Sequence, residues 1–108
     1  KYRKAHLSDA ERVWASPGPS LSPVVRTGSL GAIAMMVGNE VWLPEVARCL
    51  ALQGAETLLH PADWNCQEAG EMAATERASE NRVHLVSVTR LDSPGHLGSQ
   101  TTLAGEYL

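Results

Sequence analysis

The apolar run Ala-Ile-Ala-Met-Met-Val at residues 32–37 decides the fold. It is bounded by Gly31 and Gly38 and is too short for a helix. A continuous apolar run of this length is typical of a strand that is buried on both faces, as in a parallel sheet covered by helices. We therefore expect a central strand here, with Met35 and Met36 in the core.

A helix is expected directly after this strand, at residues 44–53. Pro44 suits the first helical turn, where its missing N–H costs nothing, and Gly54 suits the position just past a helix. The spacing i, i+3, i+4, i+7 predicts that one face of this helix is buried. That face consists of Val46, Cys49, Leu50 and Gln53.

Further along the chain, strand-like and helix-like segments alternate. Residues 56–60 and 84–89 are rich in β-branched and apolar side chains, which predicts strands, and Pro61 should end the first of them. Between them, a helix should begin at residue 66 or 67 and continue to residue 82, because this segment lacks Pro and is rich in Ala and Glu. The order strand–helix–strand–helix–strand is typical of βαβ units and indicates an α/β fold. Shorter features are expected at the two ends: a strand at 24–27, a turn at 93–98 and a strand at 99–103.

The composition is that of an ordinary globular protein and excludes several classes. The chain has 108 residues, of which 44% are hydrophobic and 19% are charged. Nine basic and twelve acidic residues leave a net charge of −3, which argues against nucleic acid or an anionic membrane as a partner. The apolar stretches are far shorter than the ~20 residues of a membrane span. Two cysteines are too few for a disulfide framework, so we expect a cytoplasmic protein.

Polar residues follow two of the predicted strands, at the edge of the sheet where sites gather in α/β folds. Gly38, Asn39 and Glu40 follow the first strand, and residues 61–66 follow the second. Neither the two cysteines nor the four histidines are spaced along the chain as metal ligands usually are. We therefore expect neither a metal nor another cofactor.

Several short motifs occur in a characteristic order along the chain. They are Tyr-Arg-Lys-Ala-His-Leu at residues 2–7, Leu-Pro-Glu-Val-Ala-Arg at 43–48, Leu-Gln-Gly-Ala-Glu at 52–56, Pro61 with Trp64, and Arg-Ala-Ser-Glu-Asn at 77–81 followed by the strand at 86–90. In this order and spacing the chain resembles the carbon–nitrogen hydrolase (nitrilase) superfamily. Each motif is weak alone, but together they cover essentially all of the sequence.

The resemblance implies a larger fold than the chain itself contains. Domains of this family form a four-layer α-β-β-α sandwich and are more than twice as long. Residues 1–108 are then expected to be the central part of one such domain, processed or excised because the chain starts at Lys1 and not at Met. The missing N-terminal portion supplies the family's general-base glutamate, and the missing C-terminal portion supplies the last strands.

The resemblance also implies a chemistry, the hydrolysis of small amides, nitriles or carbamoyl compounds. A cysteine thiolate attacks the substrate carbon, a glutamate takes the thiol proton, and a lysine stabilises the developing negative charge. Lys4 falls on the position of the catalytic lysine. Glu11, seven residues on, fits the family's second glutamate, which orients the substrate and the lysine.

The nucleophile position departs from the family pattern. The cysteine should stand seven residues before Glu45, and that position is Gly38. The family's Cys-Tyr-Asp therefore reads Gly38-Asn39-Glu40, and no thioester can form on a residue without a side chain. The resemblance thus predicts a homologue that is inactive as a cysteine-dependent enzyme.

Three alternatives follow for the function. The first is a pseudoenzyme that binds a small amide or carboxylate through Lys4 and Glu11, with Asn39 and Trp64 contacting the ligand. The second is a scaffold subunit in a homo-oligomer, the assembly that the resemblance implies. The third is an active enzyme that has recruited Cys66 or a bound water, since Cys49 is expected to be inert core.

Overall fold

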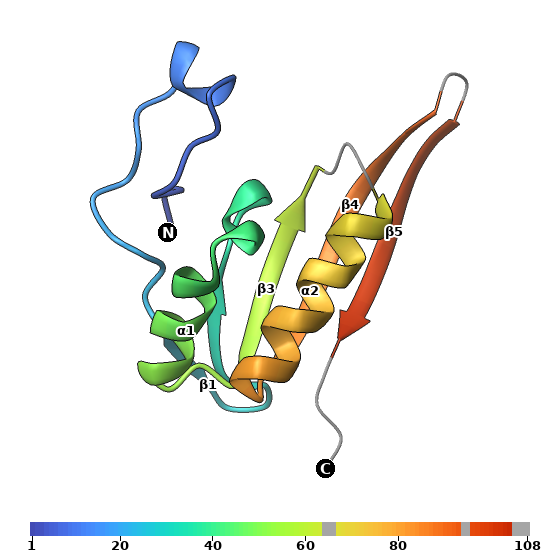
Figure 1. Ribbon diagram of the computed structural model, residues 1–108. Helices are drawn as coiled ribbons and strands as arrows, with labels where there is room; N and C mark the ends of the chain where they lie inside the picture. The colour runs from blue at the N-terminus through green and yellow to red at the C-terminus, as the bar shows by residue number, and fades with distance from the viewer. Residues whose placement is uncertain (64–66, 94–95, 105–108) are drawn as a thin grey trace.

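The computed structural model describes residues 1–63, 67–93 and 96–104 of the chain. Within these residues, two α-helices, two short 3-10 helices (η) and five strands follow one another (Figure 1). In order they are η1 (Glu11–Val13), β1 (Val25–Thr27), β2 (Gly31–Met35), η2 (Gly38–Trp42), α1 (Pro44–Leu52), β3 (Thr57–Ala62), α2 (Gln67–Asn81), β4 (His84–Ser93) and β5 (His96–Ala104).

The five strands form one mixed sheet in the order β1-β2-β3-β4-β5. The central pairs β2–β3 and β3–β4 are parallel, while β1 and β5 are antiparallel to their neighbours. Each parallel pair is connected by a helix, so β2–α1–β3–α2–β4 is the predicted succession of βαβ units. The sequence prediction of an α/β fold is confirmed.

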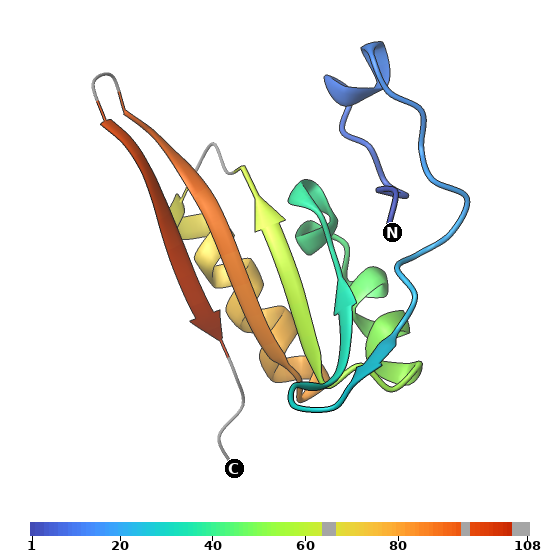
Figure 2. The same ribbon diagram turned by 180° about the vertical axis from the view of Figure 1, so that it is seen from behind.

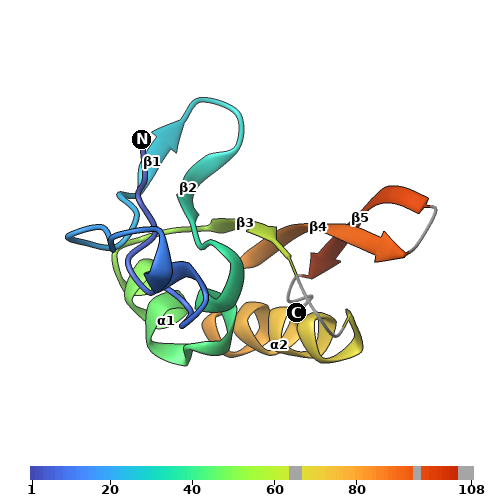
Figure 3. The same cartoon turned by 90° about the horizontal axis from the view of Figure 1, so that it is seen from above.

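Both α-helices pack on the same face of the sheet, as the views from behind and from above show (Figures 2 and 3). The core lies between this helical layer and the sheet. On α2 the buried positions include Ala74 and Ala78, whose small side chains let the helix lie close to the strands. Side chains with no more than 2% of their surface exposed make up most of this core: Ala34, Met36, Val41, Val46, Ala47, Leu50, Leu58, Ala74, Ala78 and Leu85.

The expectation that the first strand is buried on both faces is wrong for this chain. Along β2 burial alternates: Ala32 and Ala34 are buried, whereas Ile33 and Met35 on the opposite face are only partly buried. Met36, just past the strand, is fully buried, so one of the two methionines belongs to the core. The reason is that both α-helices cover one face of the sheet and leave the other face open.

Pro61 does not end the second predicted strand, because β3 continues through it to Ala62. The pairing with β2 stops at Leu59, while the pairing with β4 goes on to Ala62. Beyond Leu59, β3 is therefore an edge strand on one side. A proline without an N–H is tolerated at such an edge.

The predicted buried face of the first helix is also wrong in part. Val46, Ala47 and Leu50 of α1 are buried, whereas Cys49 and Gln53 are exposed. The helix is rotated so that the small Ala47 faces the sheet in place of Cys49. Cys49 is therefore an exposed thiol and not an inert core residue.

The last two strands form a longer hairpin than the sequence indicates. β4 runs to Ser93 and β5 begins at His96, so the strands extend into the predicted turn at residues 93–98. Their antiparallel pairing starts with Ser93 opposite His96. Within the described part of the chain, no helix is long and apolar enough to cross a membrane.

Candidate functional site

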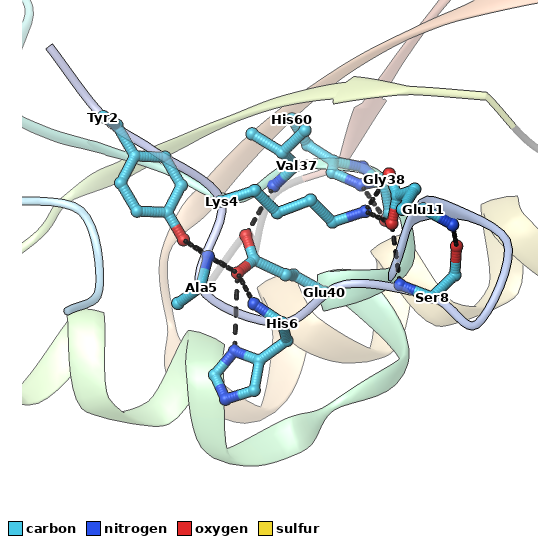
Figure 4. Close-up of polar contacts among 10 residues, drawn as sticks. All are labelled: Tyr2, Lys4, Ala5, His6, Ser8, Glu11, Val37, Gly38, Glu40 and His60. Carbon is cyan, nitrogen blue, oxygen red and sulfur yellow. Dashed lines mark hydrogen bonds and ion pairs between the residues drawn. The ribbon is translucent and has the colours of Figure 1, made fainter. Parts of the chain in front are cut away.

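The N-terminal segment lies beside η2, which follows the carboxyl end of β2 (Figure 1). It brings Lys4 and Glu11 next to η2, which carries Gly38 and Glu40 (Figure 4). Sites gather at this end of parallel strands because the chain leaves the sheet there and its loops are free to carry polar groups. These residues therefore form the candidate site.

Lys4 and Glu11 form a close ion pair. The Lys4 ammonium donates hydrogen bonds to both carboxylate oxygens of Glu11 at 2.7 Å, and only 11% of the lysine side chain is exposed. The backbone N–H of Ser8 donates to Glu11 Oε2, also at 2.7 Å. Burial would raise the pKa of Glu11, but the bonds from Lys4 and Ser8 outweigh it and hold the pKa below its ordinary value. Glu11 is therefore ionised at neutral pH, and its carboxylate lies against the Lys4 ammonium.

Gly38 faces the Lys4 ammonium. A Cβ placed on this glycine would lie 3.0 Å from Lys4 Nζ, and the backbone has a φ of +56°. A φ in this region suits glycine and strains a residue that has a side chain. The structure thus brings together the lysine, the glutamate and the glycine that the sequence places in one site.

His60 is a member of this cluster that the sequence interpretation missed. It lies on β3 with 1% of its surface exposed, and its Nε2 is 2.8 Å from the Gly38 carbonyl oxygen. A carbonyl oxygen only accepts, so Nε2 carries the proton and Nδ1 accepts from the Ser87 hydroxyl 2.9 Å away. Burial lowers the pKa of His60 and outweighs its bond to Gly38, which favours this neutral form. His60 therefore fixes the backbone at position 38 from a neighbouring strand.

The lowered pKa of His60 predicts a pH dependence of stability. The unfolded chain takes up a proton near the ordinary pKa of 6.5, whereas folded His60 does so only at lower pH. The free energy of unfolding should therefore fall as the pH is lowered through 6.5. We expect this slope to be smaller in His60→Gln, measured by urea unfolding between about pH 7.5 and 5. An unchanged slope in His60→Gln would contradict the prediction.

Glu40 is the second residue that sequence reasoning missed, since it was interpreted only as a change from the family's Asp. Its side chain is completely buried and lies between η2 and the N-terminal segment (Figure 4). Glu40 accepts hydrogen bonds from the Tyr2 hydroxyl at 2.7 Å and from the backbone N–H groups of Ala5 and His6 at 3.1 Å each. Its other oxygen accepts from the N–H of Val37 at 2.9 Å. Tyr2, Ala5 and His6 lie 34 to 38 residues from Glu40 in the sequence, so no local pattern indicates these contacts.

The remaining predicted residues contribute less to the described site. Asn39 is partly buried, and its side-chain oxygen has no hydrogen-bond partner among the described residues. Trp64 and Cys66 lie outside the described residues. A cluster of three or more side chains able to hold a metal ion is absent from the part of the chain that the structure describes.

Comparison with known proteins identifies the family. The family model named carbon–nitrogen hydrolase matches residues 1–105, so the chain belongs to the carbon–nitrogen hydrolase family. A nitrilase of Pyrococcus abyssi is 36% identical over 91 residues, which is 84% of this chain and 34% of that protein. A probable nitrilase of Schizosaccharomyces pombe is 35% identical over 92 residues, 83% of this chain and 33% of that protein.

Solved structures agree with this assignment. A carbon–nitrogen hydrolase from Helicobacter pylori superposes with a TM-score of 0.82 at 26% identity, covering 96% of this chain and 44% of that one. A mutant of an amidase from Nesterenkonia sp., solved in complex with butyramide, gives a TM-score of 0.81 at 26% identity, covering 96% and 41%. The nitrilase-like sandwich predicted for the fold class is therefore confirmed. The chain spans about a third of the length of the nitrilases named above.

Proposed function

We propose that this chain forms part of a carbon–nitrogen hydrolase pocket that binds a small amide and does not perform cysteine chemistry. The observation that carries the proposal is the juxtaposition of Gly38 with Lys4: the Cβ direction of residue 38 points at the ammonium, 3.0 Å away, and no side chain is there. A thioester needs a thiol at that point. The ion pair of Lys4 with Glu11 is retained beside it.

The ion pair favours a neutral amide over a carboxylate. Two of the three N–H donors of Lys4 go to Glu11, which leaves one for the carbonyl oxygen of a ligand. Glu11 Oε1 accepts from Lys4 and retains capacity to accept from the amide NH₂ of the same ligand. A carboxylate has no donor to offer and meets the negative charge of Glu11. A nitrile accepts from Lys4 but likewise brings no donor.

Several further predictions belong to the same proposal. Asn39 and Trp64 are proposed to contact the ligand, and the unpartnered side-chain oxygen of Asn39 among the described residues supports the first of them. We also propose that residues 1–108 form the central part of one larger domain, which the coverage of the relatives supports. A homo-oligomer and a cytoplasmic location remain predictions of the same kind.

The test uses the full-length protein with butyramide and butyrate as probes. We expect no ammonia release from butyramide above a protein-free control. We expect butyramide to bind in ligand-observed NMR, and butyrate to bind about tenfold more weakly because of its charge. Ammonia release that disappears in Cys66→Ala would contradict the proposal and support a recruited nucleophile. Absence of binding by either probe would contradict it in favour of a scaffold role.

A further inference from the structure

The buried carboxylate of Glu40 joins two segments that are far apart in the sequence. Residues 2–6 belong to the N-terminal segment, which makes no strand, and residues 37–40 consist of Val37 and the start of η2. Burying a carboxylate is costly unless hydrogen-bond donors surround it. Glu40 has such donors from both segments, so its desolvation is compensated only when the two are in contact.

The donors of Glu40 divide between its two oxygens. Oε1 faces the N-terminal segment, where it accepts from Tyr2, Ala5 and His6. Oε2 faces the other way and accepts from Val37, the residue before the glycine turn. Burial, and then the bond to Glu40, raise the pKa of the Tyr2 hydroxyl, so it stays protonated and continues to donate. The same hydroxyl accepts from the N–H of Ala5 at 3.1 Å.

These contacts flank the two positions that define the site. Ala5 and His6 directly follow Lys4, and Val37 directly precedes Gly38. One carboxylate therefore holds the backbone of the lysine segment against the backbone of the glycine turn. The distance of 3.0 Å between Lys4 Nζ and a Cβ placed on Gly38 depends on this contact between the two backbone segments.

We propose that Glu40 is a positioning residue for Lys4. It acts through the backbone of Ala5, His6 and Val37 and touches no ligand itself. Removing its charge should release the N-terminal segment locally and expose the Lys4 ammonium. The proposal deepens the proposed function, because Lys4 is the ligand-binding group there, but its test needs no ligand.

The test measures how fast Lys4 reacts in the full-length protein. Limiting acetic anhydride acetylates accessible amines, and peptide mass spectrometry compares Lys4 with the exposed Lys1. In the wild type we expect Lys4 to react much more slowly than Lys1, because it is paired and 11% exposed. In Glu40→Gln the negative charge is lost and the new amide NH₂ cannot accept the hydrogen bond that the Val37 N–H donates, so the Lys4-to-Lys1 ratio should rise about tenfold through local opening.

Three variants separate positioning from general stability. Glu40→Asp keeps the charge and should restore most of the protection, because a carboxylate still accepts hydrogen bonds there. Glu45→Gln removes an exposed carboxylate of α1 and should leave the ratio unchanged. Leu58→Ala weakens the core without changing a residue of the site. When its loss of stability equals that of Glu40→Gln, it should still leave the Lys4-to-Lys1 ratio unchanged.

Each result decides the proposal. A folded Glu40→Gln protein with wild-type protection of Lys4 would overturn it, and so would equal exposure of Lys4 in Leu58→Ala. If Glu40→Gln does not fold, Tyr2→Phe removes one donor to the same oxygen and should raise the ratio about threefold; no rise would overturn the proposal. Butyramide binding by the wild type is scored separately, so the proposed function can fail while the positioning role holds.

Discussion

Replacing Gly38 by Cys is expected to create a reactive thiol beside Lys4. The new Cβ would lie 3.0 Å from Lys4 Nζ, and a neighbouring ammonium lowers the pKa of a thiol and raises its thiolate fraction. We expect the introduced thiol to add to acrylamide at least about tenfold faster than an ordinary surface cysteine at neutral pH. The thiolate forms a C–S bond at the β-carbon of acrylamide, and the α-carbon takes up a proton. Peptide mass spectrometry of the full-length protein measures the adduct at each cysteine.

The chain offers a matched control for this substitution. A Cβ added at Gly28 meets nothing within 4 Å, so Gly28→Cys supplies an exposed thiol in a turn. Acrylamide adds to the active-site cysteine of a mutant of the Nesterenkonia amidase, and for this reason we choose it as the probe. Equal rates for the thiols of Gly38→Cys and Gly28→Cys would contradict the assignment of Gly38 to the nucleophile position. Ammonia release from butyramide by Gly38→Cys is the second readout, and its appearance would support the assignment.

The same substitution should lower stability. At a φ of +56° a residue with a side chain is strained by about 1–2 kcal/mol relative to glycine. The contact with Lys4 adds little, because the flexible end of the lysine can shift. Gly38→Ala carries the same strain without a thiol, so urea unfolding of both variants separates the backbone cost from any effect of the sulfur.

Replacing Lys4 by Met is expected to weaken the proposed amide binding strongly. A hydrogen bond from a charged donor contributes about 1.5–3 kcal/mol, so the affinity for butyramide should fall at least about tenfold. The substitution also leaves the carboxylate of Glu11 without its partner at 2.7 Å. Titration of butyramide by NMR measures the affinity, and urea unfolding measures the loss of stability.

Two further variants make this prediction specific. Lys1→Met removes an exposed lysine from the same N-terminal segment and should leave binding unchanged. The double variant Lys4→Met with Glu11→Gln removes both charges, so it should recover part of the stability but none of the binding. Retained butyramide binding in Lys4→Met would show that the lysine does not hold the ligand.

Most helices and strands could be predicted from the sequence, because the patterns that indicate them are local. The apolar run at 32–37 and Pro44 predict β2 and the start of α1 at nearly their observed positions. The rotation of α1, which exposes Cys49 and buries Ala47, depends on how closely the helix approaches the sheet. Periodicity alone does not fix that rotation. Pro61 lies inside β3 for a similar reason, because its tolerance depends on where the neighbouring strand ends.

Some residues of the site could be predicted from the sequence, and others could not. Lys4, Glu11 and Gly38 were selected by the resemblance, and the structure brings them together, although their roles stay predictions. Glu40 and His60 were missed because most of their partners lie 22 to 38 residues away in the sequence, although Val37 is only three residues from Glu40. A buried glutamate and a buried histidine carry no periodic or motif signal. Only the three-dimensional contacts show that they shape the site.

The bond between His60 and the Gly38 carbonyl has a consequence for how the site can evolve. The carbonyl oxygen of residue 38 is bound by His60 on β3, a contact that involves no side chain of residue 38 itself. Glycine codons GGU and GGC differ from the cysteine codons UGU and UGC by one base. With the loop geometry and the lysine in place, a single base change from either codon would return a thiol to this position.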